Sequence, residues 1–184
     1  MITEPKATMF TVLVPHRDYA RLIRLYRREL FAAGFAGAYS FPVAVPLAMT
    51  DRPFTRDELK EIASNLRALS FANDKNGKIA TGKQTILSCP NISPSLLGLE
   101  LDIPAPLFPE NALYTFPSLI LTTAVISPTE STILEKKEKL PQPPEFSFRA
   151  AMVANMIVRP LNQGAKGYSF EWKTGEAMWL PKAR

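Results

Sequence analysis

Prolines divide this chain into short segments. The 184 residues include 17 prolines, a share well above the usual value of roughly 5%. Proline fixes φ and removes a backbone donor, so it is disfavoured inside helices and in the centre of a sheet. Many of the prolines stand at the edges of apolar runs: Pro15, Pro53, Pro90, Pro94, Pro104, Pro106 and Pro109. We therefore expect short elements joined by rigid connections.

Two segments carry the periodicity of an amphipathic helix. The first covers residues 17–33 and is followed by Gly34, a helix-stop signal. The second covers residues 56–69, and Thr55 with Glu58 forms a capping box at its start. The apolar stripes of the two helices are Tyr19, Leu22, Ile23, Tyr26 and Leu30, and Leu59, Ile62, Ala63, Leu66 and Leu69.

Most of the remaining chain is rich in residues that favour strands. The expected strands cover residues 7–14, 39–49, 78–89, 95–103, 116–126 and 146–158, followed by a hairpin of 168–172 and 177–180 around a turn at 173–175. Residues 127–145 contain four prolines and a mixed charge run, which predicts an exposed excursion. The order of elements predicts a single α+β domain over residues 1–184, with largely antiparallel sheets.

Charge and cysteine usage indicate the environment. A lone cysteine, Cys89, excludes an internal disulfide and fits a reducing compartment. The first residues carry no basic segment followed by an apolar one, and no apolar run approaches the ~20 residues of a membrane span. We therefore expect a cytoplasmic protein without a membrane partner. The net charge of +5 favours anionic partners at long range.

Two segments of the chain echo each other. Residues 41–47 read Phe-Pro-Val-Ala-Val-Pro-Leu, and residues 116–122 read Phe-Pro-Ser-Leu-Ile-Leu-Thr. Each follows a polar turn and enters an expected strand. With the preceding strand and helix, this layout resembles the two-histidine (2H) phosphoesterases, the family of the 2′,5′ RNA ligase-like proteins. Residues 159–161 and 167–172 are similar to that family's closing strands.

The resemblance implies two lobes that face each other across a cleft, with helices packed outside. In the family, each lobe contributes a strand with a His-x-Thr or His-x-Ser motif, typically after Phe-Pro or Pro. Aligning Phe-Pro puts Ala44 and Leu119 at the histidine positions and Pro46 and Leu121 at the threonine positions. A shift by one residue puts Val43 and Ser118, then Val45 and Ile120, at these positions. Neither register contains a histidine.

Two-histidine chemistry needs one imidazole as base and another as acid, because imidazole titrates near neutrality. This chain contains a single histidine, His16, at the start of the first helix. We therefore assign no catalytic residue. One histidine and one cysteine cannot form a tetrahedral zinc site, and no glycine-rich phosphate loop is present, so we expect no metal and no cofactor. We interpret Cys89 as a small buried hydrophobe.

Arginines form a row on the first helix. Arg17, Arg21, Arg24 and Arg28 follow i, i+4, i+7 and i+11, with Arg27 alongside, so the four share one face over roughly 17 Å. The arginine fork matches the geometry of a phosphate group. The row is either a solvated outer face or a binding surface for an anionic partner such as RNA.

The leading hypothesis is a catalytically degenerate 2H-like domain that acts as a ligand-binding or interaction module. The resemblance implies a cleft lined by residues 41–48 and 116–123, including Ser118 and Thr122, with a floor suited to an apolar or flat ligand. One alternative is an active phosphoesterase on RNA or cyclic nucleotides that uses Lys83, Thr122 and Thr123. Another is an unrelated α+β domain that only binds a protein partner.

Overall fold

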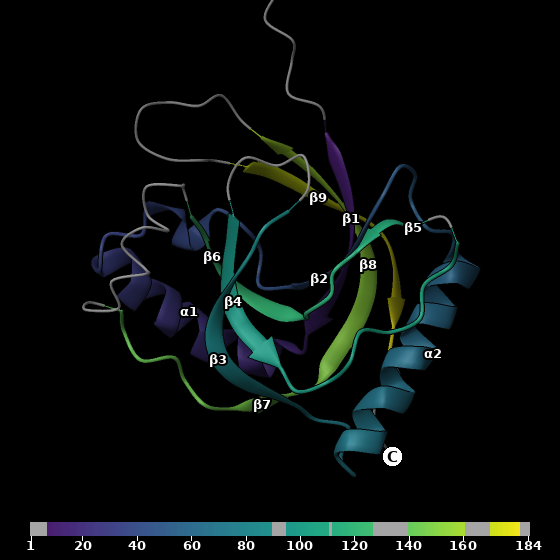
Figure 1. Cartoon of the computed structure of the whole chain (residues 1–184), viewed down its shortest axis with the longest axis horizontal. Coiled ribbons are helices and arrows are strands. Elements are labelled where there is room, and N and C mark those ends of the chain that lie inside the picture. The colour runs from purple at the N-terminus through teal and green to yellow at the C-terminus, as the bar shows by residue number, and fades with distance from the viewer. Residues whose placement is uncertain (1–6, 90–94, 111, 127–139, 161–169, 181–184) are drawn as a thin grey trace, which may run out of the picture.

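The structure is a computed structural model, and it describes residues 7–89, 95–110, 112–126, 140–160 and 170–180. Its strands form two antiparallel sheets (Figure 1). The five-stranded sheet has the order β5 (Ala112–Thr115), β2 (Val45–Thr50), β1 (Thr8–Pro15), β8 (Ala150–Pro160) and β9 (Phe170–Trp179). The four-stranded sheet has the order β6 (Ile120–Ile126), β4 (Ser95–Leu101), β3 (Ile79–Leu87) and β7 (Ser147–Phe148). The α+β class with antiparallel sheets is confirmed.

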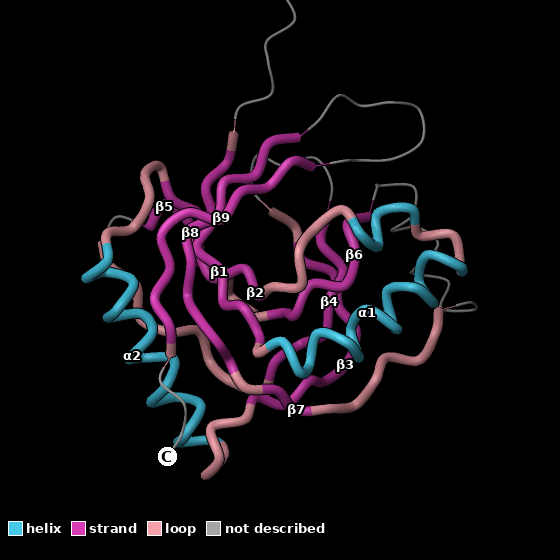
Figure 2. Tube along the Cα trace, turned by 180° about the vertical axis from the view of Figure 1, so that it is seen from behind, coloured by secondary structure: helices cyan, strands magenta, loops and turns pink. Residues whose placement is uncertain are grey.

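The two α-helices pack against different sheets (Figures 1 and 2). Helix α1 (Arg17–Ala32) lies beside β6, whereas α2 (Arg56–Asn73) lies beside β8 and β9. A short 3₁₀ helix, η1 (Ala36–Tyr39), follows α1 and also packs on β6. The helices therefore cover the outside of the two-sheet body, as expected.

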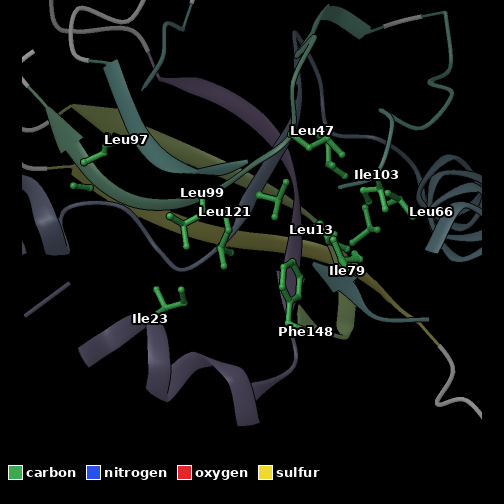
Figure 3. Close-up of a cluster of buried hydrophobic side chains, with 14 of the residues drawn as sticks. Leu13, Ile23, Leu47, Leu66, Ile79, Leu97, Leu99, Ile103, Leu121 and Phe148 are labelled. Atoms are coloured by element: carbon green, nitrogen blue, oxygen red, sulfur yellow. The ribbon is translucent and has the colours of Figure 1, made fainter. Parts of the chain in front are cut away.

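The buried side chains form two clusters. The central cluster joins both helices to both sheets, and in Figure 3 Ile23 of α1 points toward Leu99 and Leu121. The inter-sheet cluster contains no helix residue and draws on strands of both sheets and the loops that enter them. Its members are Phe10, Val12, Phe41, Ala44, Met49, Leu87, Cys89, Leu96, Phe116, Ile120, Val125, Ala154, Met156 and Val158. Full burial of one such large apolar side chain stabilises the fold by about 1.5–3 kcal/mol.

Both helix ends follow from local sequence chemistry. At the end of α1, the Gly34 N–H donates to Phe31 O and the Phe35 N–H donates to Leu30 O, each at 3.0 Å. This is a Schellman motif, and Gly34 occupies its left-handed position with φ 102°. At the start of α2, Thr55 and Glu58 form the predicted capping box. Both helix predictions are confirmed, with α2 extending to Asn73.

Two predictions about the C-terminal strands are wrong. The single strand expected over 146–158 is two strands in different sheets, β7 and β8, because the chain crosses between the sheets at Arg149. The hairpin expected around 173–175 is one continuous edge strand, β9. Ala177 pairs with Ala154 and Thr174 with Met156, so two β9 residues lie opposite Asn155 in a bulge. Polar residues are tolerated there because an edge strand faces solvent.

Three other segments differ from expectation. Within 39–49, only residues from Val45 onward form a strand, and within 116–126 the strand begins at Ile120. Strand β5 was not predicted. Of the expected excursion 127–145, residues 127–139 lie outside the described residues, and 140–145 have no regular structure. Those six residues are not detached, since Leu140 packs on the central cluster and Pro141 O accepts a hydrogen bond from the Tyr26 hydroxyl at 3.4 Å.

Candidate functional site

The two Phe-Pro segments meet in the structure. Strand β2 follows the first segment and β6 follows the second, and the two strands belong to different sheets. A hydrogen bond joins β6 to the residue just before β2, because the Thr122 N–H donates to Ala44 O at 3.0 Å. A site to which both sheets contribute residues would lie at the junction of these segments.

Phenylalanines fill this junction. The Phe10 ring from β1 packs edge-on against Phe41, with centroids 6.1 Å apart, and parallel to Phe116, with centroids 6.3 Å apart. Tyr114 adds a further edge-on contact to Phe116 at 5.1 Å. Such aromatic pairs contribute about 0.5–1.5 kcal/mol beyond the area they bury. The phenylalanines of both Phe-Pro pairs thus share one buried neighbour.

A buried arginine holds the same junction from the α1 side. Arg27 is 4% exposed. Its guanidinium donates to Phe41 O at 2.6 Å and Pro42 O at 3.1 Å in the first segment, and to Thr122 O at 2.8 Å in the second. Burial lowers the pKa of Arg27 to about 10, so the group remains protonated at neutral pH. A charged fork here satisfies carbonyl oxygens and holds the two segments together.

The six suspected cleft positions do not form one exposed surface. Ala44 lies in the inter-sheet cluster, whereas Leu119 and Leu121 lie in the central cluster. Pro46 and Thr122 are buried and Ser118 is exposed. Ile120, the neighbour of Leu119, shares the cluster of Ala44. The straight Phe-Pro alignment therefore pairs two residues that face different parts of the core.

Lys83, Thr122 and Thr123, the residues suggested for an active phosphoesterase, differ in their exposure to solvent. The Lys83 side chain is 77% exposed, and its Nζ lies 3.8 Å from Glu100 Oε1. Thr122 and Thr123 are fully buried, and the Thr123 hydroxyl donates to Leu97 O at 3.1 Å. The described structure therefore places the lysine in solvent and both hydroxyls in the core. They form no common group that a substrate would reach.

His16 and Cys89 each have a role in the fold that explains their position. His16 caps α1, where its Nδ1 accepts from the Asp18 N–H at 3.5 Å and lies 2.9 Å from Asp18 Oδ2. Cys89 belongs to the inter-sheet cluster, and burial raises the pKa of its thiol to about 12. A thiol with that pKa is a poor nucleophile at neutral pH. In the described ranges, no three His, Cys, Asp or Glu residues gather as a potential metal site.

The arginine row is exposed on α1. Arg17, Arg21, Arg24 and Arg28 all face solvent, and none forms an ion pair with another described residue. An open hollow of about 470 Å³ lies on this face, lined by Arg21, Arg24, Leu25, Arg28 and Tyr39. A second hollow of about 470 Å³ lies on α2, lined by Ser64, Arg67, Ala68 and Phe71. Neither hollow includes the suspected cleft positions.

Two buried polar residues that join distant segments of the chain were not predicted from the sequence. Arg27 was grouped with the arginine row, although its i+4 spacing from Ile23 and i−3 spacing from Leu30 place it on the buried stripe. The structure buries Arg27 and leaves Leu22, which was assigned to that stripe, 43% exposed. Asn155 was also missed. Its side chain accepts from the Phe54 N–H at 3.0 Å and donates to Phe54 O at 2.7 Å, which fixes the approach to α2.

In comparisons with known proteins, no family model, no curated protein and no solved structure matches this chain. Neither described α-helix combines the length and the apolar character that crossing a bilayer would require.

Proposed function

We propose that this chain is a catalytically degenerate 2H phosphoesterase-like domain that acts as a binding module and not as an enzyme. Three observations support the family assignment: the order of strands and helices, the two antiparallel sheets, and the meeting of the Phe-Pro segments. The assignment implies that the space between the sheets once held the catalytic pair.

The main support for a loss of activity is the packing of the Phe10 ring against both Phe41 and Phe116. These rings occupy the junction of the two sheets. The Arg27 guanidinium donates to backbone oxygens of the same segments. Acid–base catalysis by a positioned side chain contributes roughly 10²–10⁴-fold per group. With one histidine in the chain, and that residue capping α1, no pair is present to supply it.

The proposal is tested by incubating the purified protein with 2′,3′-cyclic nucleotides and with 2′,5′-linked dinucleotides. We expect no hydrolysis above the rate in buffer. Turnover that disappears in Lys83→Ala or Thr122→Ala would overturn the proposal in favour of an active phosphoesterase. Because Thr122 is buried, Thr122→Val is the matched control for packing, and circular dichroism shows whether each variant is folded.

A further inference from the structure

The outer face of α1 differs from an ordinary solvated helix face. Alongside the arginines it exposes the large apolar side chains of Leu22, Leu25 and Phe31, and the exposed Tyr39 of η1 lies next to them. The Phe31 and Tyr39 rings are 54% and 52% exposed and lie 5.8 Å apart between centroids. Exposed apolar groups that gather next to a charged row indicate a contact surface. Tyr39 and three arginines line the same hollow.

The position of Tyr39 is set by the fold and not by a free loop. The chain leaves α1 at Gly34 and enters η1, which packs on β6. Gly37 allows this close approach, because a Cβ at that position would lie 1.9 Å from Val125 O. Tyr39 ends η1 and is thereby held beside Arg21, Arg24 and Arg28. An aromatic ring fixed next to a cationic row is a preformed arrangement.

We propose that this α1 face, made of Arg21, Arg24, Arg28 and Tyr39, binds single-stranded nucleic acid. Guanidinium forks bind backbone phosphates, and the Tyr39 ring stacks on an unpaired base. The net charge of +5 favours the approach of a polyanion. A duplex would offer phosphates but no free base face, and an acidic peptide would offer no base at all. The combination of cations and an exposed ring therefore favours a single strand.

This inference rests on the proposed function in one respect, since a non-catalytic module must act by binding. Helix α1 also divides its arginines between two roles. Arg27 is buried and bonded to carbonyl oxygens, whereas Arg21, Arg24 and Arg28 keep their donors toward solvent. The binding face can therefore be altered without touching the junction of the Phe-Pro segments.

The test is fluorescence anisotropy with a labelled oligouridylate of about twelve nucleotides, a length within the range that single-strand modules cover. Three phosphate contacts predict a slope of log K against log salt of about −2. Arg21→Gln with Arg24→Gln should leave one contact and reduce the slope to about −0.7. Arg56→Gln with Arg67→Gln removes two exposed arginines from α2 and should leave both slope and affinity unchanged.

The stacking contact has its own variants. Tyr39→Ala should weaken binding by about 5-fold or more with the salt slope unchanged, and Tyr39→Phe should bind like the wild type because it keeps the ring. No salt-dependent binding by the wild type would overturn the inference. So would equal affinity for polyglutamate or for a duplex of the same length, or an unaffected Tyr39→Ala. Hydrolysis of a nucleotide would contradict the proposed function, whereas absent binding would contradict this inference alone.

Discussion

Arg27 Nη2 lies 2.8 Å from Thr122 O, although the two residues are 95 positions apart in the sequence. The same guanidinium reaches Phe41 O at 2.6 Å. One side chain of α1 therefore binds both the approach to β2 and the strand β6 of the other sheet. These hydrogen bonds hold the approach to β2 and strand β6 together in a closed junction.

Arg27→Lys should destabilise the protein by about 1–3 kcal/mol, because an ammonium group cannot match the fork and buried carbonyl oxygens lose their donors. Arg28→Lys is the matched control on the exposed face of the same helix, and it should change the free energy of unfolding by less than ~0.5 kcal/mol. Urea unfolding at neutral pH measures both. Equal stabilities of the two variants would mean that the Arg27 hydrogen bonds contribute little.

Gly37→Ala should destabilise the protein by about 2–3 kcal/mol, since the new methyl group would overlap the β6 backbone. A Cβ on Gly37 would lie 1.9 Å from Val125 O, whereas one on Gly82 would lie 3.6 Å from Glu100 O. Gly82→Ala is therefore the control and should change the stability by less than ~0.5 kcal/mol. Thermal unfolding distinguishes the two variants. A fully stable Gly37→Ala would show that η1 does not need its close contact with β6.

Acid should remove a contribution from the start of α2. The bidentate Arg52 pair and the Thr55 N–H lower the pKa of Glu58 from 4.5 to about 2. The folded state thus binds the proton more weakly than the unfolded chain, so the contribution is complete above about pH 4.5 and is lost as pH falls toward 2. Glu58→Gln should flatten the stability profile in that window.

The control for this pH effect is Glu61→Gln, which removes a nearby exposed carboxylate outside the capping box. It should retain the wild-type dependence between pH 4.5 and 2. Thr55→Ala should cost about 1 kcal/mol at neutral pH, because one helix N–H loses its acceptor. Unfolding in urea across the pH series checks all three variants. An unchanged profile for Glu58→Gln would remove the capping box as its cause.

Local sequence patterns predicted the helices and strands of this fold better than they predicted which strands pair in which sheet. The Gly34 stop and the Thr55–Glu58 capping box depend on neighbouring residues only, so both helix predictions are confirmed. Membership of a sheet depends on residues far away in the chain. The change of sheets at Arg149 and the bulge opposite Asn155 leave no local signal that separates them from a long strand and a hairpin.

The sequence suggested where to compare two segments, but not how their side chains are buried. The two Phe-Pro segments, which echo each other in sequence, meet in the structure, but alternation alone does not say which face of a strand is covered. Leu119 and Ile120 face different clusters because successive side chains of an extended chain point to opposite faces, and both faces of β6 are buried. Arg27 was predicted to lie beside the exposed arginine row, because a charged side chain on a helix is normally expected to face solvent. Its burial becomes reasonable only when the carbonyl oxygens it binds are known.

The closed junction is tested most sharply by the hydrogen exchange of the Thr122 amide, measured by NMR in the native protein. This N–H donates to Ala44 O at the centre of the closed junction. If the two segments are sealed together, exchange requires global unfolding, and its opening free energy should equal that from urea unfolding. Exchange through a small local opening, at a free energy well below the global value, would show an accessible cleft between the sheets and contradict the account.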